Sequence, residues 1–171
     1  MKKILVYCLL VTFCLLAGSS LMALSKDANE LPACKYCGMS RETFAHSRML
    51  VEYDGSTVGT CSLHCAALDL ALNLDRAPTM ISVADYDTKE LINAETAAWV
   101  IGGKKPGVMT KNAKWAFAKK EDAEKFRLEN GGRIAGFDEA LEAAYKDLAS
   151  DTKMIREKRK MMKKKMMEKK G

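Results

Sequence analysis

The sequence lacks the residue patterns on which most catalytic sites depend. It has only two histidines, and it shows no nucleophile–base triad and no glycine-rich phosphate loop. Asp85 and Asp87 form a carboxylate pair, yet nothing in the sequence brings a nucleophile or a substrate to them. We therefore expect a binding protein and not an enzyme.

A hydrophobic run long enough to span a bilayer is also lacking. Lys2 and Lys3 precede an apolar run of 14 residues at 4–17, whereas a membrane helix needs about 20. Small residues at 18–20 follow, which is the order of a secretory signal. Aromatic residues precede both cysteines of the run, so it has no lipoprotein signal. We expect residues 1–25 to be a signal peptide and the protein to be periplasmic, with an uncleaved membrane anchor as the alternative.

Net positive charge is absent from most of the chain. The formal net charge is +6, but residues 151–171 hold ten Lys/Arg and three Asp/Glu, while residues 1–150 sum to −1. This distribution and the export signal argue against a nucleic-acid partner. The basic tail at 151–171 also holds methionines. It is a solvated helix end, a contact for an anionic membrane surface or an acidic partner, or a set of thioether ligands for Cu(I).

Hydrophobic periodicity predicts an α+β fold of two small ββαβ units followed by a long C-terminal helix. After a polar linker at 24–33, the first unit (26–88) has strands at 49–53 and 57–61 around an Asp54-Gly55 turn, a helix after Ser62 and a strand at 79–86. The second unit (89–150) has strands at 98–101, 113–118 and 133–137, with a helix at 119–132 before the last. We expect these helices to bury Leu63, Ala67, Leu70, Leu74, Ala123, Phe126 and Leu128. The order suggests a weak internal duplication, in which Phe117 replaces Cys61.

Four cysteines remain once the signal is removed, in the order C-x2-C, 23 residues, C-x3-C. Cys34 and Cys37 can turn two thiolates toward one centre, and Gly38 can adopt the positive φ that such a turn needs. Cys61 and Cys65 lie four apart at a predicted helix start, where the helix dipole stabilises thiolates. A knuckle, a hairpin and a helix start in this order are typical of a treble-clef metal site.

These cysteines allow three chemistries. We favour metal binding, because four soft thiolates suit Zn²⁺ or Cu(I). Two structural disulfides are the alternative that an oxidising compartment suggests. A thioredoxin-like redox pair would make the protein an exported thiol–disulfide oxidoreductase, but Gly38 interrupts the helix that such a pair should open.

Several segments in series resemble the NosL family of nitrous oxide reductase accessory proteins, which are regarded as copper chaperones. They are CKYCGM at 34–39, TCSLHCA at 60–66, VADYDT at 83–88, INAETAAWVIGG at 92–103, VMT at 108–110 and NGGRIAGFDEAL at 130–141. The resemblance implies two ββαβ units, Cu(I) binding through soft ligands, and delivery in the periplasm to nitrous oxide reductase or another cuproenzyme. Cys34, Cys37 and Met39 match the family's C-x2-C-G-M motif, and Met109 matches a methionine after the glycine stretch. The basic tail is not part of the family pattern.

The resulting hypothesis is a Cu(I) chaperone with soft ligands around Cys34, Cys37, Met39, Cys61 and Cys65. His64 and Met109 are further candidate ligands. The alternative for His64 is an ordinary surface histidine, and the alternative for Met109 is a hydrophobic anchor. His46 has no partner visible in the sequence. The rival hypothesis is a structural zinc module with four cysteine ligands that only binds another protein.

Overall fold

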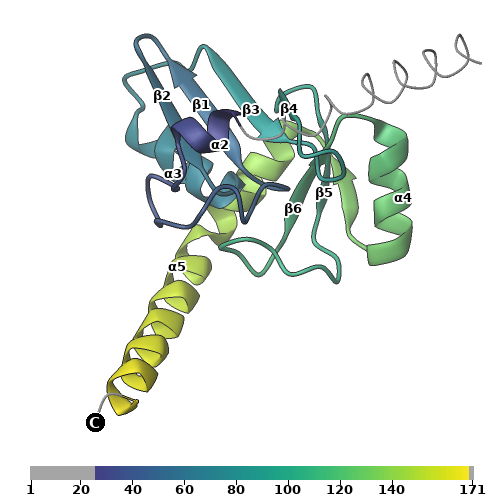
Figure 1. Cartoon of the computed structure of the whole chain (residues 1–171). Helices are drawn as coiled ribbons and strands as arrows, with labels where there is room; N and C mark the ends of the chain where they lie inside the picture. The colour runs from purple at the N-terminus through teal and green to yellow at the C-terminus, as the bar shows by residue number, and fades with distance from the viewer. Residues whose placement is uncertain (1–25, 170–171) are drawn as a thin grey trace, which may run out of the picture.

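The structure of the protein, a computed structural model, describes residues 26–169 (Figure 1). Its helices are α2 (Lys26–Glu30), α3 (Leu63–Leu72), α4 (Lys120–Asn130) and α5 (Phe137–Glu168). Its strands are β1 (Met49–Tyr53), β2 (Ser56–Thr60), β3 (Met80–Ala84), β4 (Leu91–Asn93), β5 (Ala98–Ile101), β6 (Lys114–Phe117) and β7 (Arg133–Ala135). The predicted signal peptide lies outside the described residues. Within 26–169, no helix has both the length and the apolar character needed to cross a bilayer.

The first sheet is antiparallel and has the strand order β2-β1-β3-β4. The predicted hairpin joins β1 and β2 through Asp54 and Gly55, and Gly55 has the positive φ of 73° that favours glycine in such a turn. Strand β1 buries Met49, Val51 and Tyr53. The edge strand β4 was not predicted, because it has only three residues and all three are half-buried.

The second sheet has the order β6-β5-β7, which repeats the order β2-β1-β3 of the first. Each sheet therefore contains a ββαβ unit, with α3 or α4 between its second and third strands, and the predicted α+β class is confirmed. A parallel bridge between Asp85 and Ala116 connects the two sheets. The Asp85 carboxylate also accepts hydrogen bonds from the backbone of Asp87, Thr88 and Ala118, so this residue joins the units.

Most of the predicted inward positions are buried. Those that are at least partly buried are Leu63, Ala67, Leu70, Ala123 and Phe126. Leu74 and Leu128, however, are 89% and 74% exposed. Leu74 lies beyond the last residue of α3, and Leu128 is about 200° around α4 from Phe126, so both predictions are wrong.

The segment predicted as a polar linker at 24–33 contains helix α2. Asp27 of this helix forms ion pairs with Arg41 at 2.7 Å and with Arg48 at 2.8 Å. These two arginines hold the pKa of the Asp27 carboxyl below its usual range, although burial alone would raise it. The linker prediction fails because a charged helix can be stabilised by buried partners that lie 14 and 21 residues away.

The long helix α5 confirms the predicted C-terminal helix. Its first half buries Phe137, Ala140, Ala144 and Asp151, and it packs against α3 and β5. From residue 156 to 169 every residue is exposed, and this part projects from the body of the molecule (Figure 1).

Candidate metal centre

The first cysteine pair lies on a tight knuckle. An antiparallel bridge between Ala33 and Ser40 closes it, and the Cys34 N–H donates to the Met39 carbonyl at 2.9 Å. The Gly38 N–H donates to the Cys34 carbonyl at 2.9 Å, and Gly38 has a φ of +74°. The expected positive φ of Gly38 is therefore confirmed. Residues 35–37 form a turn and not a helix, which removes the helical context that a thioredoxin-like pair requires.

The second pair lies where β2 meets α3. Cys61 follows the last residue of β2, and Cys65 is in the first turn of α3. Helix α3 begins directly after Ser62, as predicted, and Ser62 is at its N-cap position, but the Ser62 hydroxyl donates to the Val108 carbonyl at 3.0 Å and does not cap the helix. The knuckle, the hairpin of β1 and β2, and α3 form the predicted treble-clef-like arrangement.

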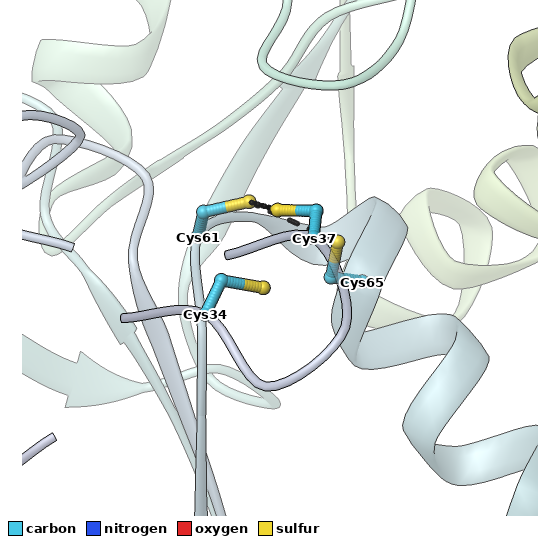
Figure 2. Close-up of side chains that lie close together, drawn as sticks. All are labelled: Cys34, Cys37, Cys61 and Cys65. Atoms are coloured by element: carbon cyan, nitrogen blue, oxygen red, sulfur yellow. Dashed lines mark hydrogen bonds between the residues drawn. The ribbon is translucent and has the colours of Figure 1, made fainter. Parts of the chain in front are cut away.

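The four sulfurs converge on one point (Figure 2). All four Sγ atoms lie within 4.8 Å of one another, with 3.4 Å between Cys37 and Cys61 and 3.8 Å between Cys61 and Cys65. A tetrahedral ion with bonds of about 2.3 Å to sulfur would separate its ligands by about 3.8 Å. All four cysteines are free thiols, unlike in the disulfide alternative. The donor set therefore fits one soft ion.

The thiols differ in how readily they ionise. Hydrogen bonds from Cys37, Cys61 and Cys65 hold the pKa of Cys34 far below its usual range. Cys37 donates to Cys34, which raises its pKa, but bonds from Cys61 and Cys65 outweigh this and bring it to about 7. Donation to Cys34 raises the pKa values of the other two. A negative charge on one thiol of the cluster is therefore stabilised by hydrogen bonds from the others, and a bound cation would favour thiolates at all four positions.

The centre is closed on most sides and open at Cys37. Cys34, Cys61 and Cys65 are at most 2% exposed, whereas Cys37 is half-buried. The three buried cysteines belong to a hydrophobic cluster that includes Val100, Trp115 and Phe117 of the second unit. The second unit thus contributes apolar packing around the site, and the most exposed approach to the four sulfurs is at Cys37.

A buried carboxylate that the sequence analysis missed fixes the knuckle to α3. Asp69 accepts hydrogen bonds from Tyr36, which lies between the two knuckle cysteines, and from Tyr53 at 2.7 Å. Lys35 is a third partner at 3.3 Å. Burial and the Asp69 carboxylate raise the pKa of both tyrosines. The signal for Asp69 was an acidic residue four positions after Cys65, on the buried face of an apolar helix.

Arg41 was also missed, and it holds the end of β2. It is fully buried and donates to the carbonyl of Thr60, the residue before Cys61, at 3.2 Å. It also donates to the carbonyls of Leu31 and Met49. A Cβ at Gly59 would lie 2.9 Å from its Nε, so glycine is required for this close approach. No sequence pattern marked this arginine, because most of its partners are backbone carbonyls and its ion-pair partner Asp27 lies 14 residues away.

The two candidate methionines lie beside the cysteine cluster. Met39 and Met109 are half-buried and pack against the same hydrophobic cluster as Cys34, Cys61 and Cys65. Met109 has a φ of +62°, a strained conformation for a residue other than glycine. Their positions suit both a hydrophobic anchor and a thioether ligand at the rim, so both ligand assignments stay predictions.

The two histidines have different surroundings. His64 is buried and turns toward α5, where its Nδ1 lies 3.5 Å from an Asp151 carboxylate oxygen. It lies outside the group of converging sulfurs among the described residues, and its ligand role stays a prediction. His46 packs against both Tyr86 and Trp115, with distances between ring centroids of 5.8 and 5.3 Å. Burial lowers the pKa of both histidines, which favours their neutral forms.

Comparison with known proteins identifies the family. The NosL family profile matches residues 25–145, more than half of the chain. The chain is similar to the crystal structure of the copper chaperone NosL from Shewanella denitrificans, with 24% identity and a TM-score of 0.51 over 63% of this chain and 87% of that one. The solution structure of apo-NosL from Achromobacter cycloclastes matches with 20% identity and a TM-score of 0.38 over 53% and 82%. Functionally curated proteins gave no match. On the strength of the profile match, this chain belongs to the NosL family.

Proposed function

We propose that this protein is a periplasmic carrier of Cu(I), bound in the four-cysteine centre and passed to a cuproenzyme, with nitrous oxide reductase as the expected recipient. The observation that carries this proposal is the convergence of four sulfurs, three buried and one at an open edge. Thiolates prefer Cu(I) to Cu(II). A solved relative of the same fold is named a copper chaperone, which is consistent with this role.

The geometry suggests how the cargo would be held and released. We place the first capture of the ion on the knuckle, because the knuckle carries Cys37, the most exposed thiol, together with Cys34. Cys61 and Cys65, the buried pair where β2 meets α3, then complete the coordination of the ion. Because Cys37 is the least buried of the four, we place the release step there: an incoming thioether, imidazole or thiolate replaces Cys37 while the buried cysteines still hold the ion. Cu(I) leaves by ligand exchange, and no electron is transferred.

A specific observation also favours a second candidate, a resident Zn²⁺ ion that stabilises the first unit. The sulfur distances of 3.4 and 3.8 Å are close to those of a closed tetrahedral S4 site, the coordination that structural zinc prefers. In this case Cu(I) would bind elsewhere, with Met39 and Met109 as the soft groups at the rim of the same cluster.

Competitive titration separates these functions. The reduced chain without residues 1–25 is titrated with Cu(I) and with Zn²⁺ against chelators of known affinity, and the free thiols are counted by alkylation. We expect Cu(I) to displace Zn²⁺ and to protect the four cysteines. A tight Zn²⁺ complex that Cu(I) cannot displace would contradict the Cu(I) carrier function and support the structural zinc site. If neither ion binds, both functions are contradicted.

A further inference from the structure

The exposed end of α5, residues 156–169, is a surface that the proposed carrier function does not use. It has eight Lys/Arg and only two Glu, and it extends away from the two sheets (Figure 1). The methionines Met161, Met162, Met166 and Met167 are 58–67% exposed here. Large apolar side chains that are this exposed and lie among cations indicate a binding surface. Its partner should offer both negative charge and an apolar medium.

Three of the four exposed methionines share one face of the helix, and Met167 lies about 100° beyond the edge of that face. At about 100° per residue, Met161, Met162 and Met166 fall within about 140° of its circumference. The half-buried Met154 and Ile155 begin the same face nearer the domain. Most of the cations point to the other sides. Lys158, Lys165 and Lys169 lie within the apolar face, where their methylene stems can lie along it while the ammonium groups reach outward.

We propose that residues 156–169 of α5 are a docking surface for an anionic lipid bilayer. A helix that combines cations with an apolar face binds in the interface between headgroups and acyl chains. The cations surround much of the helix and do not form a single stripe, which matches a diffuse layer of lipid phosphates better than a fixed set of carboxylates on a protein. Methionine is flexible and polarisable, so it adapts to this medium.

One contact links this surface to the cysteine centre. Nη2 of Arg159 donates to the Cys37 carbonyl at 3.3 Å, so the lipid-binding segment begins beside the open edge of the site. Asp151, eight residues earlier, lies against His64, which stands between Cys61 and Cys65. Docking of the helix therefore holds the Cys37 edge close to the bilayer surface. Lipid binding itself does not depend on the proposed function. The orientation does, because it is useful only if copper leaves at Cys37, which would then face the membrane.

Vesicle binding tests the docking without any metal. The chain without residues 1–25, whose described part contains both hydrophobic clusters, is sedimented in 150 mM salt with vesicles of phosphatidylcholine containing 30% phosphatidylglycerol, and with phosphatidylcholine alone. We expect binding to the anionic vesicles only. The variant K160Q/K163Q/K164Q/K165Q should bind at least tenfold more weakly. The matched control K104Q/K105Q/K119Q/K120Q removes four exposed lysines of the second unit and should change binding less than twofold.

The apolar contribution has its own variants. Replacing Met161, Met162 and Met166 by Gln should weaken vesicle binding several-fold, whereas Leu at the same positions should retain it. Docking should also slow the alkylation of Cys37 by a water-soluble maleimide several-fold, and the tail glutamine variant should lose this effect. An unchanged alkylation rate would overturn the orientation.

Three results would overturn the docking itself: no binding to anionic vesicles, an equal loss in the two lysine variants, or binding to a polyglutamate probe in place of the vesicles. The last would assign the surface to an acidic protein. Since these assays contain no copper, their failure is distinct from a failure of the carrier function.

Discussion

The two ββαβ units share a topology but differ at the junction where their second strand meets the helix. In the first unit, β2 is followed by Cys61 and then α3; in the second, β6 ends in Phe117 ahead of α4. Phe117 packs against Tyr86 and Phe126, with ring centroids 5.6 and 5.2 Å apart. Counted back from the first residue of each helix, however, Phe117 corresponds to Thr60 and Ala118 to Cys61, so the predicted replacement of Cys61 by Phe117 is off by one residue. The junction thus supplies a thiol in one copy, and in the other an alanine that follows an aromatic core residue.

The units also differ in what holds them together. Buried charge organises the first unit, through Arg41, Asp27 and Asp69 around the cysteine loops. Aromatic and aliphatic packing organises the second, around Trp115 and Phe126. The second unit packs apolar side chains around the metal centre, while the first supplies all four thiols. The comparison indicates that a repeated scaffold allows one copy to become a site and the other to pack around it.

Removing both cysteines of the strand–helix junction should have the largest effect. In the double variant C61S/C65S, hydroxyl groups replace two soft ligands, and hard oxygen donors bind Cu(I) poorly. We expect the affinity for one Cu(I) per chain to fall at least about 100-fold, beyond the effect of losing an outer-shell partner. Competition with a Cu(I) chelator measures it.

The control change at the junction of the other unit is Phe117→Leu. It should reduce stability by about 1 kcal/mol and leave the Cu(I) affinity nearly unchanged. If C61S/C65S kept the affinity of the unmodified chain, copper would be held by other groups and the contrast between the two junctions would have no bearing on copper.

Loss of the buried arginine should have the next largest effect, and it tests whether charge organises the first unit. Arg41→Ala leaves Asp27 without one of its partners and several buried carbonyls without a donor. Breaking a buried ion pair of this kind costs about 3–5 kcal/mol. Urea unfolding should show this loss. Arg127→Ala, in a half-exposed pair with Glu124 on α4, should leave the stability unchanged within error, and an equal loss in both variants would contradict the distinction.

Acid should destabilise the protein by a smaller amount, through the histidines between the units. Burial lowers the folded pKa of His46 and His64 below 6.5, so the unfolded state binds more protons once the pH falls below that value. Their contribution to stability is therefore complete above about pH 6.5 and is lost as the pH falls toward the folded pKa.

Urea unfolding at pH 7.5 and pH 5.5 measures this loss. The variant His46→Phe keeps an aromatic ring against Tyr86 and Trp115 but cannot be protonated, so it should lose less stability between the two pH values. An identical loss in the variant would show that His46 does not contribute.

Short-range signals predicted much of this fold and site from the sequence. The Asp54-Gly55 pair marked the hairpin, and the spacing of the four cysteines marked a metal centre with its knuckle and helix start. Such signals lie within a few residues of one another and follow from backbone geometry, which explains why they can be read without a structure.

Features that depend on distant partners escaped the sequence analysis. Asp69 meets Tyr36 across 33 residues, and Arg41 satisfies carbonyls from three separate segments. The helix α2 forms in a polar stretch whose partners are Arg41 and Arg48. Buried polar networks leave no periodic pattern, because each member is stabilised by a contact that exists only after the chain has folded.

Two glycines give the smallest and most selective test of the comparison. Gly38 of the knuckle has a φ of +74°, and a Cβ there would meet nothing within 4 Å. Gly132 of the second unit has a φ of +97°, and a Cβ there would lie 2.8 Å from the Ile101 carbonyl oxygen. Gly38→Ala should therefore lose only the conformational term of about 1–2 kcal/mol.

Gly132→Ala should lose more than Gly38→Ala in urea unfolding, since β5 and β7 would have to separate to make room for the methyl group. Gly38→Asn should recover part of the loss at the knuckle, because asparagine tolerates positive φ. Equal losses of stability for the two alanine variants would mean that the knuckle, like the β-sheet of the second unit, has no free space around its glycine. The edge of the site at Cys37 would then be less open than the structure shows.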